Sequence, residues 1–179
     1  MSTILRRYFV MSAFDGAVTL FGVILASFLA NIIDPLIVIK LGLATTVAVG
    51  VSGFAGAFFT ESAERKLELK QIEASLHRTL ERTDLHRAYL FASVITAVVD
   101  GLSPFLASIF ILLPFALGGF GLSVEFMYYS SFFLALVCVF FLGMFLGKVS
   151  QENLIKTGIK LVLAGLACMA IISLIDKIL

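Results

Sequence analysis

Two aspartate–glycine pairs lie inside long apolar stretches of this chain. Asp15-Gly16 falls in an apolar run over residues 8–30, and Asp100-Gly101 falls in a second run over residues 87–117. A carboxylate at the centre of a membrane helix costs roughly 2.5–3.5 kcal/mol, so an intramembrane acid is a candidate functional site. The alternative is that each aspartate pairs with a neighbouring hydroxyl or backbone group and only specifies packing. The duplication of the pair favours a functional site.

Each aspartate is followed, four residues later, by a residue that disturbs the helix. Pro104 has no N–H to donate to the carbonyl of Asp100, which leaves that oxygen free. The hydroxyl of Thr19 is expected to bond to the carbonyl of Asp15. Each site would therefore offer carboxylate and backbone oxygens, which suit cations such as Mg, Mn or Fe(II). Met11, one turn before Asp15, is either a thioether ligand or a packing residue.

A charged segment over residues 60–83 follows the second apolar run and holds good helix formers without glycine or proline. We expect it to extend the second span as a cytoplasmic helix. One face of this helix carries three glutamates at i, i+3, i+7 spacing: Glu61, Glu64 and Glu68. These carboxylates would bind or concentrate cations. A second stripe, at i, i+4, i+8 spacing, consists of Glu73, His77 and Glu81. Both stripes are alternatively solvated or salt-bridged surface.

The composition is that of a polytopic membrane protein. Of the 179 residues, 60% are hydrophobic and 14% are charged, whereas a soluble domain is about half apolar and a quarter charged. The predicted fold is all-α, a single membrane domain over residues 1–179. Its five transmembrane helices are expected at about 8–30, 36–59, 87–117, 126–147 and 157–175. Asp34 and Pro35 suit the N-cap and the first position of the second helix.

The distribution of lysine and arginine predicts the orientation. Of the 13 basic residues, only Lys40 and Lys177 lie on the side of the membrane opposite the N-terminus in this five-span topology. The others are Arg6, Arg7, Arg65, Lys66, Lys70, Arg78, Arg82, Arg87, Lys148, Lys156 and Lys160. The positive-inside rule therefore places the N-terminus in the cytoplasm and the C-terminus outside.

Small residues predict how the helices assemble. One face of the second span carries a small residue every four positions: Ala44, Ala48, Ser52, Gly56 and Thr60. Gly143 and Gly147 form a GxxxG pattern in the fourth span. Because small residues let helix backbones approach closely, both patterns favour a homodimer formed through membrane helices.

Other classes of function have little support. The chain has no basic patch that would bind nucleic acid. It also has no nucleophile–base arrangement of the kind that catalytic residues of an enzyme form. Cys138 and Cys168 lack the spacing of a zinc site or a disulfide framework. We therefore expect neither catalytic residues nor a tightly bound cofactor.

Several motifs resemble the vacuolar iron transporter family, specifically a short prokaryotic branch without the full cytoplasmic metal-binding domain. Residues 15–19, Asp-Gly-Ala-Val-Thr, are similar to the DGLVT-type motif of the family's first span. Residues 42–65 resemble its second span, and residues 147–167 resemble its last two. The family's second-span methionine falls on Gly53 and its glutamate on Ala57, with Glu61 one turn beyond.

The resemblance implies a homodimeric carrier, in a prokaryotic plasma membrane, that exports cytosolic Fe(II) or Mn(II) in exchange for protons. The expected metal-binding residues are Asp15, Asp100, Glu61, Glu64 and Glu68; the metal is the transported substrate. When a low-dielectric cavity that contains two acids is empty, the acids would hold a proton. Metal binding would release that proton. The expected partners are lipid, divalent metal ions and a second copy. The alternative function is a non-transporting membrane scaffold that has lost the metal site.

Overall fold

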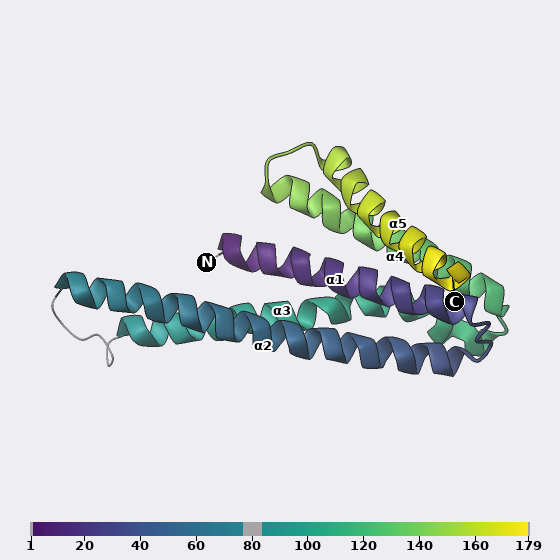
Figure 1. Cartoon of the computed structure of the whole chain (residues 1–179), viewed down its shortest axis with the longest axis horizontal. Helices are drawn as coiled ribbons and strands as arrows, with labels where there is room; N and C mark the ends of the chain where they lie inside the picture. Colours follow the sequence, from purple (N-terminus) through teal and green to yellow (C-terminus); the bar gives the residue numbers. More distant parts are fainter. Residues whose placement is uncertain (1, 77–83, 179) are drawn as a thin grey trace.

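The computed structural model describes residues 2–76 and 84–178, which form helices joined by short turns (Figure 1). The elements are α1 (Ser2–Leu29), α2 (Pro35–Leu76), α3 (Asp84–Ala116), the short 3-10 helix η1 (Leu117–Phe120), α4 (Val124–Val149) and α5 (Leu154–Ile178). Each of the five α-helices is long and apolar enough to cross a membrane. This confirms the prediction of an all-α chain with five helices able to span a membrane, while their orientation in the membrane stays a prediction.

Helix α2 continues well beyond the second predicted span. It has 42 residues, which rise about 63 Å at 1.5 Å per residue, roughly twice the ~30 Å hydrocarbon core of a bilayer. Its apolar half is therefore long enough to cross a membrane, and its charged half would then project beyond the bilayer. The predicted helical extension is observed as far as Leu76. His77 and Glu81 of the second polar stripe lie outside the described residues.

The start of α2 follows from local chemistry. The Asp34 carboxylate accepts a hydrogen bond from the backbone N–H of Leu36, at 2.9 Å, as an N-cap does. Pro35 occupies the first helical position, where its missing N–H is not needed. At the same end of the bundle, the Tyr128 hydroxyl donates to the carbonyl of Ile32 at 2.8 Å. The turn between α1 and α2 is thereby fixed against α4.

Helix α1 lies between two helical hairpins, α2–α3 on one side and α4–α5 on the other (Figure 1). Helices α1 and α3 run in the same direction, antiparallel to α2 (Figure 1). The buried face of α1 has helical periodicity and includes Ala17, Leu20, Phe21 and Ile24, which belong to the main apolar cluster. Asp15 is two residues before Ala17, so it projects from the opposite face of α1 and is exposed.

Gly143 and Gly147 pack α4 against α5 inside the chain. A Cβ on Gly143 would lie 2.7 Å from the Cα of Gly158, and one on Gly147 would lie 3.1 Å from the Cα of Leu154. The prediction that this pair joins two copies is therefore wrong, because its close contact is already made by α5. The small-residue stripe of α2 differs, since all of its members are exposed. At Gly56 a Cβ would have no described atom within 4 Å.

Candidate functional site

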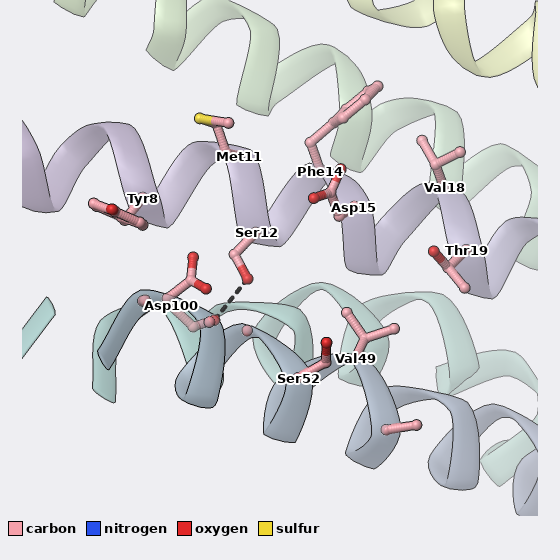
Figure 2. Close-up of a pocket in the computed structure, with 14 residues that line it drawn as sticks. Tyr8, Met11, Ser12, Phe14, Asp15, Val18, Thr19, Val49, Ser52 and Asp100 are labelled. Atoms are coloured by element: carbon pink, nitrogen blue, oxygen red, sulfur yellow. Dashed lines mark hydrogen bonds between the residues drawn. The ribbon is translucent and has the colours of Figure 1, made fainter. Parts of the chain in front are cut away.

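A cleft of about 760 Å³ opens between α1 and α2, and α3 contributes Asp100 to it (Figure 2). Asp15 of α1 also lines the cleft. Asp15 is exposed, whereas Asp100 is half-buried. The cleft's other polar side chains are those of Tyr8, Ser12, Thr19 and Ser52. The fold therefore brings the two acids into a single cleft among helices that are long and apolar enough to span a membrane.

Each glycine of the Asp-Gly pairs lies at a close contact between two helices. A Cβ on Gly16 would lie 2.6 Å from the Cβ of Pro104, so α1 touches α3 here. A Cβ on Gly101 would lie 2.8 Å from the Cβ of Phe54 and 3.0 Å from the carbonyl oxygen of Gly50, so α3 touches α2. A side chain at either glycine would push the helices apart. The adjacent aspartates are thus held next to closely packed backbone.

Asp100 is fixed by contacts to both other helices of the cleft. Its backbone carbonyl accepts a hydrogen bond of 2.6 Å from the Ser12 hydroxyl on α1 (Figure 2). This confirms that the carbonyl is available, as the proline four residues later predicts. The carboxylate lies against Gly53 of α2, where a Cβ would be only 2.7 Å from Oδ2. The acid of α3 therefore fills space that a side chain on α2 would need.

Thr19 and Met11 line the same cleft from α1. Among the described residues the Thr19 hydroxyl makes no hydrogen bond to the carbonyl of Asp15, so that expected bond is not observed. The Met11 side chain is 58% exposed. Met11 is therefore not a core packing residue of this chain, and its role as a ligand stays a prediction.

The three glutamates predicted to bind or concentrate cations do not share one environment. Glu61 is only 4% exposed, and its carboxylate pairs with Arg65 at 3.1 Å. The Arg65 guanidinium lies over the ring of Tyr89 on α3, 5.5 Å from its centroid. Glu64 and Glu68, by contrast, are exposed. The Glu61 carboxylate is therefore paired with an arginine one turn along the same helix, whereas the carboxylates of Glu64 and Glu68 face outward.

One chain supplies an incomplete set of metal ligands. Among the described residues there is no group of three or more His, Cys, Asp or Glu side chains that could hold a metal ion. Asp15 and Asp100 reach the cleft, but Glu61 lies beyond it, close to Tyr8 at its edge. Further ligands of a bound cation have to be hydroxyls, backbone oxygens, water or groups from another molecule.

Two polar residues of the cleft, Tyr8 and Ser12, were not identified from the sequence, and neither was the contact of Gly53 with Asp100. Ser12 precedes Asp15 by three residues and Thr19 follows it by four, so all three lie on one helix face. That polar stripe inside an apolar span was a usable signal. Tyr8, one turn further back, extends the same stripe. The contact of Gly53 with an acid on another helix had no signal in the sequence.

Comparison with known proteins identifies the relatives of the chain. Residues 6–94 match the VIT family. The chain belongs to this family. An uncharacterized protein of Methanocaldococcus jannaschii is 30% identical to this VIT-family protein over 174 residues, which are 96% of this chain and 88% of the relative. No solved structure matches the chain.

The family match confirms the resemblance noted in the sequence. It covers α1 and α2, which form the two walls of the cleft, and the first part of α3. VIT proteins are a family of transporters and not of enzymes. Asp15 lies inside the matched residues, and Asp100 lies just beyond them. Asp100 therefore has to be understood from its contacts in this chain.

Proposed function

We propose that this VIT-family protein exports Fe(II) or Mn(II) from the cytosol across the membrane in exchange for protons. The proposal rests on one observation: Asp15 and Asp100, from two helices that run in the same direction, line one open cleft among apolar spans. Family membership supports iron or manganese as the cargo. The carboxylate, hydroxyl and carbonyl oxygens of the cleft suit such cations.

Proton exchange follows from the chemistry of paired acids. Two carboxylates in a low-dielectric cavity repel each other when both are ionised, so the empty cleft would retain a proton. A carboxylate must be deprotonated to ligate a metal, so metal binding releases that proton. Metal and proton thus compete for the same oxygens, and a proton gradient is able to drive metal across the membrane.

A second copy of the chain would complete the cleft. An exposed Asp15 facing lipid would be unfavourable by roughly 2.5–3.5 kcal/mol at mid-membrane. The exposed residues Ala48, Ser52 and Gly56 of α2 line the same cleft, and such small residues permit close approach of another helix. A two-fold axis beside α1 and α2 would bring the two aspartates of each copy around one space. Homodimerisation is therefore part of the proposal.

The glutamates of α2 have two separate roles in this scheme. Glu64 and Glu68 are exposed and would raise the local concentration of cations near the cleft. Glu61 is one turn beyond Ala57, which lines the cleft, but it is paired with Arg65. A cation would have to compete with that guanidinium for the Glu61 carboxylate.

Uptake into proteoliposomes tests the proposal. We expect the wild-type protein to move Mn(II) or Fe(II), followed by a metal-sensitive dye, with a counter-flux of protons followed by a pH dye. Asp15→Asn should abolish metal movement, because Asn keeps the shape of the side chain without its charge. Asp100→Asn should be nearly as severe if the two acids form one site.

Asp176→Asn is the matched control, since it removes one exposed carboxylate at the end of α5, far from the cleft in sequence and on another helix. Transport at the wild-type rate in both the Asp15 and the Asp100 variants would refute the proposed site.

A non-transporting scaffold of the same fold is the second candidate. It is favoured by Gly53 and Ala57, where the resemblance places a methionine and a glutamate, and by the incomplete ligand set of one chain. Calorimetry in two buffers of different ionisation enthalpy separates the two functions. The carrier should bind Mn(II) with release of protons, whereas the scaffold should bind none.

A further inference from the structure

An apolar groove of about 460 Å³ lies on a different face of α1 from the cleft, bounded by α1, α3 and α4. It shares no lining residue with the cleft. Its lining includes Phe9, Ala13, Leu106, Phe110, Cys138 and Phe145. Among the described residues that line it, Cys138 contributes the only polar side-chain atom, its thiol sulfur. Such a groove suits a hydrocarbon chain.

The length of the groove matches one leaflet of a bilayer. Its lining residues on α4 run from Leu134 to Phe145, which corresponds to about 16 Å of helix at 1.5 Å per residue. Half of the ~30 Å hydrocarbon core is about 15 Å. An acyl chain that enters from the membrane surface would therefore fill the groove over the depth of its own leaflet.

Basic side chains flank the end of the groove at which α1 begins. The rings of Phe9 and Phe145 meet edge to face with centroids 6.1 Å apart, so α1 and α4 lie side by side there. Arg6 is three residues before Phe9, and Lys148 is three residues after Phe145. Because the two helices are antiparallel (Figure 1), each cation lies about one turn further toward the same end. Both are exposed.

We propose that this groove binds an acyl chain of an anionic phospholipid, and that Arg6 and Lys148 hold its phosphate-bearing headgroup. The groove by itself would accept the acyl chain of any phospholipid, so the two cations determine the preference. One basic residue near an anionic lipid surface raises affinity about five-fold. The pair therefore predicts a preference of about 25-fold for phosphatidylglycerol over phosphatidylcholine.

Cys138 provides a readout inside the groove. The full-length chain with Cys168→Ser has one thiol, and its alkylation by a maleimide is followed in detergent micelles containing either lipid. Phosphatidylglycerol should protect Cys138 at a concentration about 25-fold lower than phosphatidylcholine does. The double change Arg6→Gln and Lys148→Gln should abolish this preference.

The control removes two exposed lysines of α5, by Lys156→Gln and Lys177→Gln, and should keep the full preference. Thermal unfolding of every variant checks that it is folded. Equal protection by the two lipids, or a preference that survives loss of Arg6 and Lys148, would overturn the proposal. So would protection that rises with protein concentration without added lipid, because a second copy would then cover the groove.

Discussion

A methyl group added at Gly53 collides with the carboxylate of Asp100. Its Cβ would lie 2.7 Å from Oδ2, so that oxygen has to move about 0.7 Å to reach 3.4 Å, where ordinary contact begins. Overpacking typically costs about 1–3 kcal/mol, and Gly→Ala in a helix otherwise stabilises by about 1 kcal/mol. For Gly53→Ala we expect a net loss of about 1 kcal/mol, which lowers Tm by about 2–4 °C in a chain of this size.

Gly53→Ala should shift Tm in the opposite direction when Asp100 is replaced by alanine. The colliding oxygen is then gone, and only the gain in helix propensity remains, so Tm should rise by about 2–4 °C. Gly165→Ala is the control, because a Cβ there meets no described atom within 4 Å. It should raise Tm equally with and without Asp100.

Thermal unfolding of the detergent-solubilised full-length chain measures this double-mutant cycle. Equal shifts for Gly53→Ala in the two backgrounds would refute the packing of Asp100 against Gly53. With Asp100 present, the methyl group should also weaken Mn(II) binding in calorimetry. Metal–ligand distances tolerate only about 0.2 Å, and disturbing the groups that position a ligand typically costs about 10–100-fold in affinity.

Three further outcomes follow from the contacts of α2 and α4. Changing Glu64 and Glu68 together to Gln should weaken apparent Mn(II) affinity several-fold at low salt only, because exposed charges are screened; an equal loss at 1 M salt would contradict this. Arg65→Gln should lower Tm markedly, since breaking a buried ion pair costs about 3–5 kcal/mol; an unchanged Tm would show that the pair is not buried in solution. Gly143→Leu should lower Tm by separating α4 from α5, whereas Gly56→Leu should leave the fold intact and shift the protein from dimer to monomer in light scattering. The reverse pattern would place the contact between copies on α4.

Features that depend on neighbouring residues were predictable from the sequence. The number of spans follows from apolar runs of sufficient length. The start of α2 follows from Asp34 and Pro35, whose side chains act within one turn. The free carbonyl of Asp100 follows from Pro104, since the missing donor is a property of the proline itself. For the start of α2 and for the Asp100 carbonyl, the deciding atoms lie within four residues of one another.

Features that depend on the fold were not predictable. A GxxxG pattern such as Gly143–Gly147 indicates close packing but not whether the partner helix is in the same chain. The spacing of Glu61 and Arg65 permits an ion pair, yet its burial depends on the helix that carries Tyr89. The sequence around Gly53 gave no indication of its role, because that role is to leave space for the Asp100 carboxylate of α3.

The order of the two residues in each Asp-Gly pair has a geometric reason. Successive residues of an α-helix are about 100° apart around its axis. When Gly16 faces Pro104 across the α1–α3 contact, Asp15 therefore points to the margin of that contact. When Gly101 faces Phe54 across the α3–α2 contact, its preceding aspartate lies at that contact's margin in the same way.

Both margins open into one cleft because α1, α2 and α3 surround it. Each carboxylate is thus attached to backbone that close packing keeps in place, while its oxygens remain accessible from the cleft. A site that binds and releases a cation needs both properties at each acid. The packing function of the glycine and the binding function of the aspartate are therefore coupled, and the pair recurs as a unit on the two parallel helices.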